Sequence, residues 1–307
     1  MTVVSLEEAR RRASANRDPE TGLRLPADYR RTIHDSGTMT IRDIAASHER
    51  PPTGATSLYQ VVVPYLGVFT YSVGRRSTLV DANRTLMVPA DIEFTDSHPV
   101  RNVGHAAVAV APAVEVMEEL CRLHGARPAE MFRELSRPAV PGLGLAAHRL
   151  RILPEEAALE VDELAIQVLQ AVFGGGQVGR GQASRVVERA KQVIHERGCG
   201  RLSLADIARA VGVSPVYLTQ EFTRSEGMPL YRYQLQLRLS RALVELPDCE
   251  DITGLALDLG FSSHSHFGEA FRRTFGLTPA AFRASSWAEN RRLGPGRRPA
   301  PCRAAAT

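Results

Sequence analysis

The amino-acid sequence predicts an α+β multidomain protein, with an N-terminal antiparallel β-barrel and a C-terminal all-α domain that contains two helix-turn-helix motifs. Short β-type runs bounded by turn residues fill residues 57–111, as in an antiparallel sheet that curls into a barrel or sandwich. Helical periodicity begins after Pro112. One helix-turn-helix pattern then occurs twice between Leu204 and Pro279.

The β-type runs carry four aromatic residues close together in the chain. The runs are "SLYQVVV", "GVFTYSV", "STLVD", "RTLMVP", "IEF" and "HAAVAVA". Around the first two lie Tyr59, Tyr65, Phe69 and Tyr71. Small-molecule pockets favour aromatic walls, so we predict a pocket there, with a plain aromatic core as the alternative.

Residues 154–174, "PEEAALEVDELAIQVLQAVFG", predict the clearest helix of the segment that follows the strands. One apolar stripe consists of Val161, Leu164, Ala165, Val168 and Val172, and a second of Leu159, Ile166, Leu169 and Phe173. This apolar surface is wider than one core-facing side needs. The second stripe is therefore a candidate homodimer contact, with half-buried packing inside the domain as the alternative.

Composition sets the domain boundaries that we expect. Residues 1–50 are a poorly ordered N-terminal segment, and residues 51–175 are the first domain. Residues 176–183 are a linker, because five glycines within residues 174–182 cannot hold a helix or pack a core. Residues 184–286 form the second domain, and residues 287–307, which lack periodicity, are a disordered tail.

Both copies of the repeated pattern have the residues that a helix-turn-helix requires. A small alanine stands four residues before a glycine in each copy, so that helices can cross closely and the first one can end. These pairs are Ala208 with Gly212 and Ala256 with Gly260. Two apolar residues four apart then anchor each second helix, Leu218 with Phe222 and Phe267 with Phe271. Two matches about 49 residues apart disfavour a plain helical bundle.

The turn residues and the segment between the copies complete the pattern. Ser214 before Pro215 predicts the N-cap of one second helix, and Ser262 or Ser263 that of the other. Residues 229–247, with prolines at both ends, predict a helix of about 17 residues and about 26 Å. It would hold the two second helices roughly 30 Å apart, so that both could enter successive major grooves of DNA.

With these residues the chain resembles the AraC/XylS family of bacterial transcription regulators. The resemblance covers residues 184–286 and is carried by "RLSRALVEL" and "ITGLALDLGFSSHSHFGEAFRRTFGLTP", residues 238–246 and 252–279. It implies a seven-helix DNA-binding domain with two recognition helices. A looser similarity at residues 81–99, "DANRTLMVPADIEFTDSHP", implies that residues 51–175 form the cupin-like sensor and dimerisation domain common in these regulators.

The resemblance also implies which side chains face DNA. The base-reading residues that it implies are Val216, Thr219, Gln220, His264, Ser265, Gly268 and Glu269. The phosphate contacts that it implies are Ser214, Arg224, Arg272 and Arg273. Arginine often occupies the position of Gln220 or Glu269 in the family, so this chain departs from the common pattern at both places.

Composition agrees with DNA binding by the C-terminal part and argues against several other classes of protein. Residues 184–307 carry 18 Lys and Arg against 12 Asp and Glu, whereas residues 1–183 carry 20 against 22. No apolar run reaches 18 residues and the first residues lack a signal-peptide core, so we expect a cytoplasmic protein without a membrane span. The four scattered cysteines indicate reduced thiols.

We therefore expect a sequence-specific transcription regulator that binds a double-stranded DNA operator, forms a homodimer and contacts RNA polymerase. No catalytic or cofactor motif is present, and the usual cupin metal motif is missing, so neither an enzyme, a cofactor nor a metal is expected. The resemblance favours an activator controlled by a small-molecule effector. The alternatives are a constitutive regulator whose barrel only dimerises, and an enzyme with a cupin-like domain and a helical adaptor.

Overall fold

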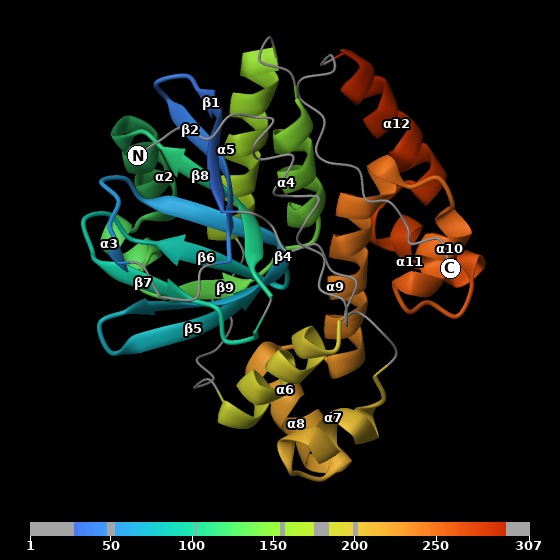
Figure 1. Cartoon of the computed structure of the whole chain (residues 1–307). Coiled ribbons are helices and arrows are strands. Elements are labelled where there is room, and N and C mark those ends of the chain that lie inside the picture. Colours follow the sequence, from blue (N-terminus) through green and yellow to red (C-terminus); the bar gives the residue numbers. More distant parts are fainter. Residues whose placement is uncertain are drawn as a thin grey trace.

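The computed structural model describes residues 28–47, 53–101, 103–153, 157–174, 184–198 and 202–292, with side chains to Ser286 in the last range. These residues form an N-terminal unit around one antiparallel sheet and a C-terminal unit of helices (Figure 1). Within these ranges, none of the helices has the length and apolar character that crossing a membrane requires.

The N-terminal unit confirms the predicted antiparallel sheet. Its strands are β1 (Tyr29–Asp35), β2 (Met39–Ala46), β3 (Thr53–Gly54), β4 (Gln60–Val73), β5 (Arg76–Asp81), β6 (Arg84–Val88), β7 (Phe94–Ser97), β8 (His105–Pro112) and β9 (Ser136–Pro138). The main path runs β1–β2–β8–β4–β6–β9, and β5 and β7 pair with the second half of β4. Among the described strands, β1 and β9 do not pair with each other, so the predicted closed barrel is not formed.

Strands β1 and β2 show that the expectation of a poorly ordered segment over residues 1–50 is wrong for residues 28–47. β2 pairs with β8 along its whole length, and its residues alternate between buried and half-buried. The sequence "MTIRDIAA" has the period of two that a half-covered strand requires, which is the overlooked signal. Residues 1–27 lie outside the described residues.

The long strand β4 changes the sheet face toward which its side chains point. Its register with β8 shifts just after Pro64, and Gly67 has a φ of +72°. A Cβ on Gly67 would lie 1.8 Å from the carbonyl oxygen of Gly104, so only glycine fits there. Beyond this point the alternation is reversed: Tyr65 belongs to the core on one face of the sheet, and Tyr71 to the core on the other.

Four helices pack on the N-terminal sheet. They are α2 (Val114–His124), α3 (Pro128–Met131), α4 (Leu143–Ile152) and α5 (Ala158–Gly174). β8 is buried throughout, because Ala106, Val108 and Val110 face these helices while Ala107 and Ala109 face the second core. The sheet therefore has a core on each side.

The C-terminal unit contains the predicted pair of helix-turn-helix motifs. Its elements are α6 (Arg185–Glu196), α7 (Leu204–Val211), α8 (Pro215–Glu226), α9 (Leu230–Glu245), the short helix η2 (Leu246–Asp248), α10 (Ile252–Asp258), α11 (His264–Phe275) and α12 (Pro279–Arg292). The first half of α9 packs into the core of the first motif and the second half into that of the second. This confirms the predicted connecting helix (Figure 1).

The last helix corrects the predicted C-terminal boundary. The expectation of a disordered tail over residues 287–307 is wrong for residues 287–292, because α12 continues to Arg292. Residues 293–307 and the linker residues 176–183 lie outside the described part of the chain.

Candidate DNA-binding site

The first helix-turn-helix has the predicted turn. α7 ends at Gly212, whose φ of +72° is a left-handed conformation that suits glycine. The hydroxyl of Ser214 accepts a hydrogen bond from the backbone N–H of Tyr217 at 3.1 Å, and Pro215 is the first residue of α8. The predicted cap and start of the recognition helix α8 are thus confirmed.

The second helix-turn-helix repeats this construction and settles which serine caps its recognition helix. The hydroxyl of Ser263 accepts from the backbone N–H of His266 at 3.1 Å, so Ser263 is the N-cap of α11. Ser262 instead lies with its hydroxyl 3.0 Å from the Nδ1 atom of the His266 ring. Gly260 provides the left-handed turn before the cap, with a φ of +81°.

Both recognition helices are anchored on one side only. The side chains that fix them to their cores are fully buried, and they are Leu218, Phe222, Phe267 and Phe271. On the opposite face of α8, Val216 is 67% exposed and Thr219 and Gln220 are exposed. The Thr219 hydroxyl donates to the carbonyl of Pro215 at 2.9 Å. The predicted base-reading residues of α8 therefore share one open face.

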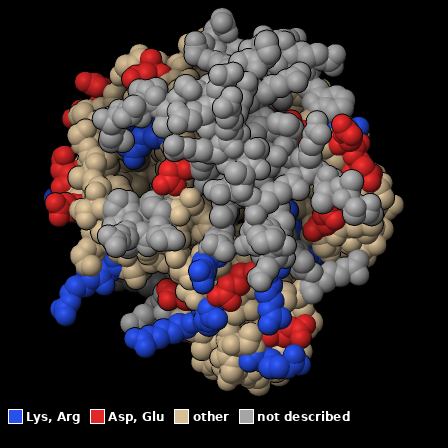
Figure 2. All heavy atoms as spheres, in the orientation of Figure 1, with Lys and Arg blue, Asp and Glu red and all other residues tan. Residues whose placement is uncertain are grey.

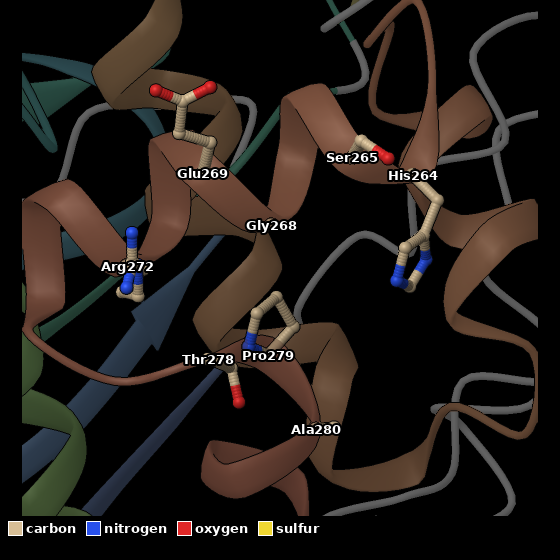
Figure 3. A pocket seen from close by; sticks show the side chains of 8 residues that line it. All are labelled: His264, Ser265, Gly268, Glu269, Arg272, Thr278, Pro279 and Ala280. Atoms are coloured by element: carbon tan, nitrogen blue, oxygen red, sulfur yellow. The ribbon is translucent and has the colours of Figure 1, made fainter.

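The predicted base-reading residues of α11 lie around one surface hollow of about 370 Å³ (Figure 3). It is lined by His264, Ser265, Gly268, Glu269 and Arg272 from α11 and by Thr278, Pro279 and Ala280 at the start of α12. Gly268 leaves its floor open, because a Cβ there would meet no atom within 4 Å. A DNA base edge or phosphate can therefore approach the backbone of α11 closely at this residue.

The three arginines predicted to contact phosphates are in different electrostatic situations. Arg224 donates two hydrogen bonds to Glu221, at 2.6 and 3.1 Å, and Arg273 donates one to Glu269 at 2.7 Å. Arg272 is exposed and has no ion-pair partner among the described residues. Exposed ion pairs are weak, so DNA can compete for Arg224 and Arg273, but only Arg272 presents an uncompensated charge.

One exposed residue of the first recognition helix was not predicted. Tyr217 is 48% exposed and stands three residues before Gln220, a spacing that places both on the same side of a helix. Its exposure distinguishes it from Leu218 and Phe222, the core anchors of the same helix. In the second copy the polar His266 stands at the corresponding position, three residues after the capping serine, and this was the available signal.

The surface charge around the first motif is mixed. In Figure 2, Lys and Arg side chains project around the lower part of the molecule, where Figure 1 places β5, α6, α7 and α8, and carboxylates lie among them. Local ion pairs along a helix also occur in this part of the chain, such as Arg209 with Asp206 and Arg189 with Glu196. Among the described residues on this face, positive and negative side chains are therefore interspersed and do not form a single basic patch.

The four aromatic residues predicted to form a pocket do not share one wall. Tyr59 is half-buried against Phe132, with ring centroids 4.7 Å apart, and it packs with Tyr65 on the helix side of the sheet. Phe69 and Tyr71 lie in the core on the other side. The prediction of one aromatic wall is wrong, because the irregular backbone between Pro64 and Gly67 reverses the alternation of β4.

Tyr71 nevertheless has an unsatisfied polar group. Its hydroxyl is buried and has no hydrogen-bond partner among the described residues, and its ring lies 5.1 Å from that of Phe94. Burial, followed by the charge of Asp96, raises the pKa of this hydroxyl well above its usual value. It therefore stays protonated and can donate to a bound molecule.

The predicted dimerisation stripe of α5 is only partly available. Leu159 is 74% exposed and Ile166 is also exposed. Leu169 and Phe173 are buried in the core of their own unit, so their assignment to a dimer contact is wrong. Helix α5 packs into the same core as α2 and the sheet, and this packing covers Leu169 and Phe173 as well as the first stripe.

Comparisons with known proteins place the C-terminal unit among transcriptional regulators. A family model described as a helix-turn-helix domain matches residues 207–285. SoxS of Salmonella typhimurium is 37% identical over 83 residues, which are 27% of this chain and 78% of SoxS. The Msm operon regulatory protein of Streptococcus mutans is 33% identical over 99 residues, which are 32% of this chain and 35% of that protein.

A solved structure gives the same match. It is a transcriptional regulator with an AraC-type DNA-binding domain from Chromobacterium violaceum, 34% identical over 33% of this chain and 91% of that chain, with a TM-score of 0.31. The chain matches about a third of the length of several curated relatives, but more than three-quarters of SoxS. The match to SoxS, over more than three-quarters of that protein, and the duplicated helix-turn-helix show that the chain belongs to the AraC/XylS family of DNA-binding transcriptional regulators.

Proposed function

We propose that the protein reads a specific operator by placing α8 and α11 in successive major grooves of one DNA duplex. The observation that supports this most strongly is the two-sided construction of both helices. Each is anchored by two fully buried apolar residues and exposes its predicted base-reading residues on the opposite side. Because α9 packs into both cores, one continuous helix sets the distance between the two reading faces.

The chemistry of these faces suggests which base edges they would contact. Gln220 has the amide geometry for a bidentate contact with adenine, and Val216 can pack against a thymine methyl group. Glu269 can accept from a cytosine amine, although it must then share its carboxylate with Arg273. The hollow at Gly268 admits DNA close to the backbone of α11. These contacts would give an operator that differs from one read by arginines at the same positions.

The N-terminal unit supplies control in this proposal. A homodimer would form through the exposed face of α5 around Leu159 and Ile166. A small-molecule effector would bind the N-terminal unit, and the unsatisfied hydroxyl of Tyr71 is the group that we assign to it. The bound dimer would then activate transcription by contacting RNA polymerase, as the family resemblance implies.

Selection of DNA from a random pool by the full-length protein tests sequence-specific reading. Enrichment of a common sequence with two conserved segments, about 10 base pairs from centre to centre, is the expected result. The same selection with the Gln220→Ala variant should keep the segment assigned to α11 and lose preference at one or two base pairs in the other. A pool in which no sequence is enriched over random DNA would contradict the proposal.

A further inference from the structure

The turn between β5 and β6 projects from the N-terminal unit into the C-terminal unit. Each of the four consecutive residues 81–84 contacts the C-terminal unit. Asp81 is bound by Tyr233 and His195, and Ala82 packs against the core of the first helix-turn-helix. The Asn83 side-chain amide donates to the carbonyl of Tyr233 at 3.3 Å, and Arg84 lies 3.4 Å from Glu226. We call residues 81–84 the interdomain turn.

The centre of this contact is a buried carboxylate whose partners come mostly from the other unit. Asp81 is completely buried and accepts hydrogen bonds from the hydroxyl of Tyr233 and from Nε2 of His195, the latter at 3.3 Å. Burial opposes its charge, but the hydrogen bond from His195 and the charge of Lys191 outweigh it and hold the pKa of Asp81 well below its usual value. Separation of the units would leave this charge without those partners.

A second group of charges lies beside the first. Glu226, at the end of α8, is buried and pairs with Nζ of Lys191 at 2.7 Å and with Arg84 at 3.4 Å. Lys191 is the one lysine of the 307-residue sequence and is itself buried. Its ammonium group also lies 5.5 Å from the ring centroid of Tyr233. Lys191 therefore connects the Asp81 group with the Glu226 group, and α6, α8 and α9 all contribute to the network.

The contact leaves the reading face of the first motif open. Glu226 is buried at the interface, whereas Val216, Thr219 and Gln220 of the same helix are exposed. A further contact between the units lies at the second motif, where the ring of His148 on α4 packs 4.8 Å from that of Phe282 on α12. Both motifs are thus held against the N-terminal unit while their predicted DNA-reading residues face outward.

We propose that the interdomain turn is a latch that docks the C-terminal unit on the N-terminal unit in one orientation. The contacts that hold this orientation are those of the interdomain turn and the ring contact of His148 with Phe282. Buried polar networks of this kind specify one arrangement because any other leaves charges unpaired. The latch is the route by which a change in the N-terminal unit alters the placement of both recognition helices. This last step rests on the proposed function, whereas the docking does not.

Small-angle X-ray scattering of full-length variants tests the latch. Tyr233→Phe removes only the hydroxyl that binds Asp81, and Asp81→Asn removes only the charge. The matched control is Tyr65→Phe, because Tyr65 donates an equivalent buried hydrogen bond to Asp43 at 2.7 Å within the N-terminal unit alone. Circular dichroism and an unfolding curve for each variant exclude loss of the fold.

Tyr233→Phe and Asp81→Asn should both shift the radius of gyration upward, and the double variant should show no larger shift than the single ones. Tyr65→Phe should retain the wild-type radius even where its unfolding midpoint falls. If Asp81→Asn does not fold, hydrogen exchange of the α6 backbone amides is measured in Tyr233→Phe instead. The latch predicts faster exchange in this variant than in the wild type. A radius of gyration and α6 amide-exchange rates in Tyr233→Phe equal to those of the wild type would overturn the proposed latch.

The same variants separate the latch from the proposed function. Loss of the latch leaves α8 and α11 intact, so Tyr233→Phe should still bind the selected DNA. If the wild-type protein binds no specific DNA, sequence-specific reading fails, but scattering still decides whether the latch exists. If DNA is bound specifically and the radius never changes, the latch alone fails.

Discussion

The hydroxyl of Tyr233, in the helix that joins the two helix-turn-helix motifs, donates a hydrogen bond to the carboxylate of Asp81, 152 residues earlier in the chain. Tyr65 and Asp43 make the same kind of bond inside the N-terminal unit, where the guanidinium of Arg151 lies over the Tyr65 ring and contacts Asp43. The protein thus uses one arrangement twice, once within a unit and once between units. The net stability that such buried charges contribute is small, because the cost of removing them from water offsets the attraction between the partners.

Because of the buried side chain of His148, we expect the folded protein to lose stability on mild acidification. It is buried with both ring nitrogens unpartnered among the described residues, and burial, followed by the charge of Arg151, lowers its pKa to about 3. The unfolded chain takes up a proton near its ordinary pKa of about 6.5, whereas the folded protein does not, so stability falls as pH drops from about 6.5 toward 3.

The expected contribution of His148 is about 2 kcal/mol between pH 7 and pH 5. Urea unfolding of wild type and His148→Phe at the two pH values measures it, since the variant should lose this part of the pH dependence. His124→Phe, at an exposed position on α2, is the control and should keep the wild-type dependence. A wild-type dependence in His148→Phe would show that the folded protein protonates His148 freely.

Arg272 and Arg224, of which only Arg224 forms an ion pair among the described residues, should contribute differently to DNA binding. Arg272→Ala should weaken binding to all sequences alike and reduce the slope of log affinity against log salt by roughly one. Arg224→Ala should reduce it less, because Glu221 already compensates that charge in the free protein. Titrations between about 50 and 200 mM salt measure both slopes. Equal reductions would mean that the ion pair of Arg224 opens on DNA.

A charge on the exposed face of α5 should dissociate the proposed dimer. Leu159→Glu introduces a carboxylate at a mostly exposed apolar residue, so the monomer should remain folded while a dimer would have to bury the charge. Sedimentation velocity over a range of protein concentrations measures the change. Leu257→Glu, at an exposed leucine of α10, is the matched control and should sediment as the wild type does. Unchanged association of Leu159→Glu would remove α5 from the interface.

The sequence was most informative where function and fold depend on short-range patterns. The helix-turn-helix turns were predictable because Gly212, Gly260 and their capping serines act on their nearest neighbours. The two apolar stripes of α5 were visible, but not that neighbouring elements cover Leu169 and Phe173 and leave Leu159 open. That outcome depends on packing partners far away in the chain.

Two further features could not be predicted for related reasons. The four aromatic residues lie on two faces of the sheet because the alternation of β4 reverses near Gly67. A single glycine within a strand does not reveal such a reversal in the sequence. The latch joins residues more than 100 positions apart, so no local pattern reveals it. One signal was available: the one lysine of an arginine-rich chain is buried at the centre of this network.

The binding affinity of Gln220→Ala for the selected operator and for random DNA tests base reading by α8 most directly. The exposed Gln220 amide has no partner among the described residues, so its removal should leave the fold and the phosphate contacts intact. The account predicts a loss of about 1–3 kcal/mol on the operator and little change on random DNA. An equal loss of affinity for both DNAs would contradict it.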